Sequence, residues 1–204
     1  QILDISNVDD IVAKDRMTDS GSLELDGARN VDTFVIGAST YAIVTAYTDD
    51  GIQIIDISDP ASIVAKASAT DGVNSFTLLG EVRDVSTFTI GSSTYAIVTA
   101  NVDDGVQIID ISDPTAIVAK DSMDQVIDDL PLNGARGVAT FIINSVVYAI
   151  VTGNNSDAVQ MFELGNCASS DCVYTEAAEV EAASTSTSGT CSRHVILGNC
   201  GTIA

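Results

Sequence analysis

Apolar and polar residues alternate along this chain in short stretches. β-Branched and aromatic residues fill each stretch, and clusters of Gly, Ser, Asn and Asp separate the stretches. This pattern predicts β-strands joined by tight turns, because branched side chains suit a pleated strand and the separating residues suit turns. Apolar residues do not recur at three- and four-residue spacing, so helices are not expected.

The whole pattern repeats. The stretch DDGIQIIDISDP at 49–60 returns as DDGVQIIDISDP at 103–114, and YAIVTA at 41–46 recurs at 95–100 and, as YAIVTG, at 148–153. A repeat of about 54 residues is typical of propellers, solenoids and arrays.

Each unit predicts four strands, which in the second copy are 84–90, 94–100, 105–111 and 116–122. Short turns between them predict an antiparallel meander. Apolar residues occupy both faces of the third strand, where Ile108 and Ile109 are adjacent. A sheet that is apolar on both faces must be covered on both, as stacked propeller blades are. The predicted fold is therefore all-β, with four-stranded antiparallel units stacked as about three and a half blades and a disulfide-bearing C-terminal tail.

The repeat also predicts the division of the chain. The propeller-like domain is expected at 1–183, followed by a Ser/Thr linker at 184–190 and a tail at 191–204 closed by a disulfide. Within the domain the predicted units are a half blade at 1–20, blades at 21–74 and 75–128, and a divergent blade at 129–183, whose fourth strand is expected in VYTEAAEV.

The predicted half blade leaves the ring of blades open. The chain starts within a strand pattern and without an initiator Met, so it is expected to have been processed or to be part of a longer protein. Missing upstream sequence is one way to cover the open ends. The favoured alternative is head-to-tail assembly of copies, with the half blade completed by a neighbour, so that two chains supply seven blades in a ring or a filament forms.

A known family shows the same strand motifs. The run SSTYAIVTA followed by DDGVQIIDISDP resembles the LVIVD-type β-propeller repeat, over about residues 1–164. The resemblance implies the propeller fold and a surface or secreted protein, and it implies little about activity. The unit here is longer than expected for that family, and the extra length precedes each repeated Arg, where Leu25, Leu79 and Leu132 align.

The charge of the chain excludes two classes of partner. It has 29 acidic and 8 basic residues and a net charge of −21. Such a surface repels nucleic acid phosphates and anionic headgroups. No apolar run reaches the roughly 20 residues that a membrane helix needs, so membrane insertion is not expected.

The basic residues recur at two repeat positions. Lys14, Lys66 and Lys120 lie on the fourth strand, where lysine guards an edge strand against aggregation; a ligand role is the alternative. A second set, just before the first strand, is Arg29, Arg83 and Arg136. These arginines are expected near the propeller axis, in salt bridges to aspartates of the same or the next blade such as Asp32 and Asp84, or, alternatively, in a ring that binds an anionic ligand.

The acidic turns between the second and third strands are the best candidates for cation binding. They contain Asp49 and Asp50 in one copy and Asp103 and Asp104 in the next. Calcium takes six to eight oxygen ligands, yet the D-x-D-x-D-G pattern is missing, so turn stabilisation is favoured over a calcium site. No other cofactor is expected.

The C-terminal segment indicates the compartment. All four cysteines lie there: Cys167, Cys172, Cys191 and Cys200. Their spacings match no zinc pattern, so two disulfides are predicted, and with them an extracellular or cell-surface location. Asn154 begins an Asn-Asn-Ser glycosylation sequon in an exposed turn.

No catalytic motif emerges, so an enzyme is not expected. The single His194 lies in the tail, apart from any Ser or Asp motif. Two functions remain: a secreted or cell-surface structural protein that assembles with copies of itself, or a binding module whose acidic turns or arginines hold a cation, glycan or protein partner.

Overall fold

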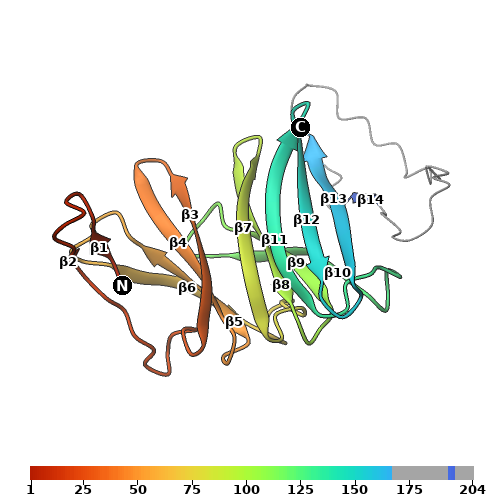
Figure 1. Cartoon of the computed structure of the whole chain (residues 1–204), viewed down its shortest axis with the longest axis horizontal. Coiled ribbons are helices and arrows are strands. Elements are labelled where there is room, and N and C mark those ends of the chain that lie inside the picture. Colours follow the sequence, from red (N-terminus) through yellow and green to blue (C-terminus); the bar gives the residue numbers. More distant parts are fainter. Residues whose placement is uncertain (167–192, 196–204) are drawn as a thin grey trace.

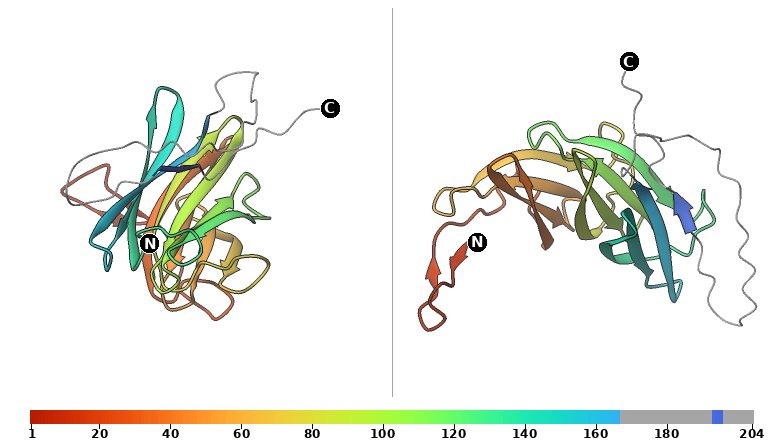
Figure 2. Two further views of the ribbon diagram at one scale, coloured as in Figure 1. Left: turned by 90° about the vertical axis from the view of Figure 1, so that its right-hand side faces the viewer. Right: turned by 90° about the horizontal axis from the view of Figure 1, so that it is seen from above.

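The computed structural model describes residues 1–166 and 193–195, which form β-strands joined by turns. Three four-stranded sheets and one two-stranded sheet stand in a row that curves into an open arc (Figures 1 and 2). The all-β prediction is confirmed. Within the described residues, no helix has the length and apolarity to cross a membrane.

The first two complete sheets are antiparallel meanders, as predicted. Each runs through its strands in chain order, with antiparallel pairing between neighbours. Their strands are β3 (Ala28–Ile36), β4 (Ser39–Ala46), β5 (Gly51–Asp56) and β6 (Val64–Thr70), then β7 (Val82–Ile90), β8 (Ser93–Ala100), β9 (Gly105–Asp110) and β10 (Val118–Asp124).

The third sheet departs from the meander at its fourth strand. Its first strands, β11 (Ala135–Ile143), β12 (Val146–Gly153) and β13 (Ala158–Asn166), pair antiparallel. The fourth, β14 (Arg193–Val195), comes from the predicted tail and pairs with β13 in parallel. The expected strand VYTEAAEV, the linker at 184–190 and all four cysteines lie outside the described residues.

The N-terminal segment forms the third and fourth strands of a blade that lacks its first two. β1 (Leu3–Asp4) pairs with β2 (Val12–Ala13), and the register matches that of β5 with β6. No residue of 1–20 is fully buried. One described hydrogen bond ties this hairpin to the first complete sheet, from the backbone N–H of Ile63 to a carboxylate oxygen of Asp15, at 2.8 Å.

The apolar cores lie between the sheets rather than within them. One core joins the first and second complete sheets, and a second core joins the second and third. The adjacent residues Ile109 and Ile108 belong to the first and the second core, and neither has any exposed surface. The middle sheet is thus covered on both faces, as its sequence predicts. The middle blade contributes to both cores, so its removal would expose the blades on either side.

Candidate functional site

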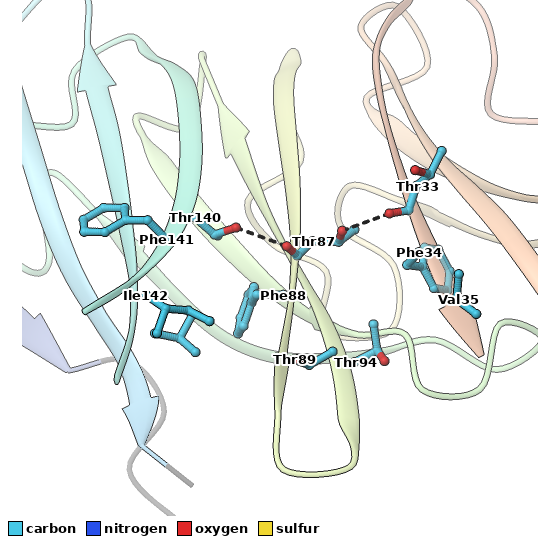
Figure 3. Close-up of a pocket in the computed structure, with 11 residues that line it drawn as sticks. Thr33, Phe34, Val35, Thr87, Phe88, Thr89, Thr94, Thr140, Phe141 and Ile142 are labelled. Atoms are coloured by element: carbon cyan, nitrogen blue, oxygen red, sulfur yellow. Dashed lines mark hydrogen bonds between the residues drawn. The ribbon is translucent and has the colours of Figure 1, made fainter. Parts of the chain in front are cut away.

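The innermost strands β3, β7 and β11 line a groove of about 700 Å³ on the inner side of the arc (Figure 3). Only uncharged side chains line it, chiefly threonine, phenylalanine, valine and isoleucine. The phenylalanine of each innermost strand stacks on the tyrosine of the neighbouring strand, with ring centroids 5.4 to 5.8 Å apart. These pairs are Phe34–Tyr41, Phe88–Tyr95 and Phe141–Tyr148.

A row of threonine hydroxyls joins the innermost strands across the groove. The Thr87 hydroxyl donates to the carbonyl of Thr33 at 3.3 Å, and the Thr140 hydroxyl donates to the carbonyl of Thr87 at 3.1 Å (Figure 3). Asp32 reinforces this contact, because one of its oxygens accepts the N–H of Thr87 at 2.6 Å and, at 2.8 Å, shares the single proton of the Thr87 hydroxyl with the Thr33 carbonyl. Side chains therefore hold together strands that share no main-chain ladder.

Asp84 connects three blades. Its carboxylate accepts a hydrogen bond from the Asn30 side chain of the preceding blade and from the N–H of Val138 in the following one, the latter at 2.9 Å. Asp32 and Asp84 were the expected partners of the arginines. They serve as acceptors for backbone and side-chain donors between blades instead.

The repeated arginines make contacts that differ from one blade to the next. Arg83 forms an ion pair with Glu81 at 3.0 Å and donates to Asn101 at 2.9 Å. The guanidinium groups of Arg29 and Arg83 lie over the ring of Tyr47, at 4.6 and 4.5 Å from its centroid. A hydrogen bond to Glu81 and burial raise the pKa of Tyr47. Cation–π stacking of this kind stabilises a structure, so Arg29 and Arg83 are already engaged.

The third arginine lies apart from that stack. Arg136 is exposed, and its blade has Asn154 where the first blade has Tyr47. Over residues 1–166, no ion pair joins Arg29 or Arg136 to an aspartate. The three arginines therefore do not form a ring of equivalent groups.

The acidic turns use their carboxylates as backbone acceptors. Within their own blades, Asp49 accepts the N–H of Asp26 at 2.7 Å and Asp103 accepts the N–H of Gly80 at 2.6 Å. Burial raises the pKa of Asp103, and the nearby charges of three further aspartates add to the effect.

The second aspartate of each turn reaches the next blade. Asp50 accepts the N–H of Glu81, and Asp104 accepts the N–H of Gly134, both at 2.7 Å. Their φ angles of 51° and 53° place both in the left-handed region, which aspartate tolerates better than most residues. In the described part of the chain, no group of three or more acidic, His or Cys side chains is arranged to hold a metal ion.

The repeated lysines lie opposite aspartates on the neighbouring strand. Their ammonium nitrogens are 3.0 to 3.3 Å from a carboxylate oxygen. The pairs are Lys14–Asp4, Lys66–Asp56 and Lys120–Asp110. Each such aspartate also accepts the N–H of the serine two residues later, which shapes the DIS turn.

This turn predicts a dependence of stability on pH. Burial raises the pKa of Asp110, but the N–H and hydroxyl of Ser112 and the charge of Lys120 outweigh it and leave the pKa below 3.8. A lowered pKa means that the ionised carboxylate stabilises the fold above that value and that this contribution is lost as the pH falls further. When the pH is lowered past about 4, we expect the melting temperature of the wild type to decrease. The melting temperature of Asp110→Asn should decrease less steeply over the same pH range.

Circular dichroism melts between neutral and acid pH measure this effect. Asp10→Asn is the matched control, because Asp10 is exposed and pairs with no lysine among the described residues. Its profile should follow the wild type. Burial raises the pKa of Asp121, so this residue changes the pH dependence of stability in the opposite direction. The test is therefore the difference between the variants and the wild type, not the slope of the wild-type profile alone. Identical profiles for all three proteins would contradict the assigned role of Asp110.

The remaining predicted site residues lie at the C-terminal end of the arc. Asn154 is exposed, and its side-chain amide donates to Asn155 at 3.1 Å. The third copy of the acidic turn continues with Ser156, which accepts the N–H of Asn133 at 3.0 Å, and Asp157, which is exposed with a φ of 49°. His194 lies in β14, of which the structure describes the backbone.

Sequence reasoning missed the inter-blade roles of Thr33, Thr87 and Thr140 and of the aspartates beside them. A signal was present, because a threonine precedes the phenylalanine of every first strand. The recurrence of threonine before the phenylalanine indicates the same role in each unit, although it does not indicate which neighbour the threonine contacts.

Two comparisons with known proteins gave matches. The family model described as LVIVD repeat matches residues 40–71 and 91–125. The comparison with curated proteins finds no match.

Among solved structures, a functionally unknown protein from Desulfotomaculum acetoxidans DSM 771 is 17% identical, with a TM-score of 0.47, and the alignment covers 69% of this chain and 42% of that one. The exo-β-1,3-galactanase of Phanerochaete chrysosporium is 12% identical over 69% of this chain and 35% of its own, with a TM-score of 0.47. The chain spans less than half the length of these proteins. No activity transfers at such similarity.

Proposed function

We propose that this chain, which is built from LVIVD repeats, is a secreted or cell-surface structural protein that assembles head to tail with copies of itself. The LVIVD repeat is not an enzyme family, and we infer that the chain is not an enzyme. The four cysteines, taken as two disulfides, and the sequon at Asn154 support the extracellular location.

The observation that carries the proposal is the exposure of an inter-blade face at the C-terminal end of the arc. Ile97 and Val106 of the second blade have no exposed surface, because the third blade covers them. Their counterparts in the third blade, Ile150 and Val159, are 38% and 45% exposed. Isoleucine and valine at the same repeat positions are thus buried where a further blade follows and partly exposed where none follows among the described residues.

The N-terminal end exposes the opposite face. Val85 of the second blade is 5% exposed, whereas its counterpart Val31 in the first blade is 57% exposed. One described hydrogen bond joins the N-terminal segment to this end, and Leu3 and Ile5 of the segment are themselves 49% and 65% exposed. Apolar faces of this kind favour association.

Contact between the two different ends is heterologous, so it produces a closed ring or an open filament. In the proposed contact, the third blade of one chain lies beside the first blade of the next. Strands β11, β12 and β13 of the first chain and residues 1–20 of the second then form one shared blade, which completes the half blade.

Sedimentation velocity over a range of protein concentrations, with negative-stain imaging of the largest species, tests the proposal. We expect the sedimentation coefficient to rise with concentration and rings or filaments to appear. Because the exposed face is apolar, high salt should not dissolve them. A chain that remains monomeric at the highest soluble concentration would exclude self-assembly and leave its apolar ends to further repeats of a longer polypeptide.

The groove along β3, β7 and β11 favours a second candidate, a module that binds a glycan or a protein segment. Its lining is uncharged, so an ionic ligand does not suit it, and a cation would have to bind at the acidic turns. Thermal melting separates these cases, because a ligand that binds only the folded state raises the melting temperature. A rise with calcium would favour the turns, and a rise with a neutral glycan would favour the groove.

A further inference from the structure

Three hydrogen bonds recur at both described interfaces between complete blades. In the first, a turn aspartate accepts the N–H of the next blade's turn, as Asp104 accepts that of Gly134. In the second, a threonine of the second strand donates to the carbonyl of the next blade's arginine, as Thr99 donates to Arg136 at 2.9 Å. In the third, the threonine hydroxyl of the later blade's first strand donates to the carbonyl of the equivalent threonine in the earlier blade, as Thr140 donates to Thr87.

The C-terminal end carries one half of each of these three bonds. The positions that would face a following blade are the carboxylate of Asp157, the hydroxyl of Thr152 and the carbonyl of Thr140. Thr152 accepts the N–H of Gly137 at 2.9 Å, just as Thr99 accepts that of Asp84 at 3.1 Å. The Thr152 hydroxyl therefore has the same position in its blade as the Thr99 hydroxyl, and its proton remains available for donation to a following blade.

The N-terminal end carries the other half of each bond. The counterparts in the first complete blade are the N–H of Gly27, the carbonyl of Arg29 and the hydroxyl of Thr33. Gly27 and Thr33 are exposed. A donor at one end thus corresponds to an acceptor at the other, in all three cases.

We propose that Asp157 and Thr152 of one chain bind Gly27 and Arg29 of a second copy, and that this contact reproduces the interface between neighbouring blades. The inference rests on the proposed head-to-tail assembly and names its contact residues. The apolar surfaces match as well, because Ile150 and Val31 occupy positions that are buried at the internal interfaces. Another copy is the fitting occupant, since its repeat offers the three partners at the spacing already used twice within the chain.

The docked arrangement requires β1 of the second copy to give way to β13 of the first, and β2 to take the edge of β13 that β14 occupies in the single chain. β1 and β2 are two residues long, and the hairpin has no fully buried residue. An isolated two-stranded hairpin is marginally stable in water. Three further strands with an apolar face offset its displacement.

The test compares the association of three variants with that of the wild type by sedimentation velocity. Asp157→Gly removes the carboxylate, and glycine accepts the φ of 49° without strain. We expect about tenfold weaker association, since a charged acceptor is lost from the interface. Ile150→Glu places a charge in the apolar face and should leave the chain monomeric.

Asp129→Gly is the matched control. Asp129 is exposed, has a φ of 53° and lies outside the three recurring bonds, so its variant should associate like the wild type. Circular dichroism melts verify that each variant is folded. If the wild type assembles and both Asp157→Gly and Ile150→Glu assemble equally well, this inference is overturned while the proposed function stands. A monomeric wild type would overturn both.

Discussion

Replacing Ile97 by alanine is expected to lower the free energy of unfolding by about 3 kcal/mol, the usual cost of removing a large aliphatic side chain from a closed core. Ile97 has no exposed surface and belongs to the core between the second and third complete sheets. Both sheets are held by their strands, so the cavity cannot collapse easily. Urea unfolding followed by circular dichroism measures the loss.

Ile150→Ala is the control for this variant, because Ile150 occupies the same position in the third blade and is 38% exposed. At protein concentrations where the chain is monomeric, its cost should stay near 1 kcal/mol, since water already reaches the side chain. Equal losses for the two variants would mean that the third blade is covered in the monomer. That result would remove the main support for the proposed assembly.

Replacing Asp104 by glycine is expected to cost about 2 kcal/mol. The carboxylate accepts the N–H of Gly134 in the next blade, and Gly134 is buried. Without the acceptor, a buried N–H loses its partner, which costs about 1 to 3 kcal/mol. Glycine suits the φ of 53° at this position, so backbone strain does not contribute.

Asp157→Gly provides the matched comparison in the monomer. Asp157 has a nearly equal φ of 49° and no following blade among the described residues. Its replacement should cost only the few tenths of a kcal/mol by which glycine loosens the unfolded chain. The difference between the two variants, measured by urea unfolding, gives the contribution of one inter-blade hydrogen bond. A difference near zero would show that the Asp104 bond adds no stability.

The arrangement of strands could be predicted from the sequence because it depends on local periodicity. The adjacent pair Ile108 and Ile109 shows why: side chains alternate along a strand, so neighbouring isoleucines must face opposite ways, and each needs its own core. The structure places them in two different cores. Turn chemistry was equally local, as the serine bond to Asp110 shows.

The partners of individual polar residues could not be predicted, because they depend on how one blade is rotated against the next. Asp84 and Arg83 are adjacent in sequence, yet Asp84 accepts from two other blades while Arg83 stacks on Tyr47 of the preceding blade. No pattern within a single repeat specifies that rotation. The parallel pairing of β14 with β13 could not be predicted either, because it joins segments that are distant in sequence.

The recurring bonds between blades have a consequence for how such chains change over time. Each unit of about 54 residues carries two different sides whose donors and acceptors match, so that one side fits the other side of any neighbour of the same kind. Duplication of one unit in the gene therefore lengthens the arc with an interface that already works, and loss of one unit rejoins two compatible sides. The number of repeat units can therefore change by whole units while each contact between blades stays under the same selection. Each added or lost unit changes the free energy of unfolding by roughly the contribution of one unit and one interface.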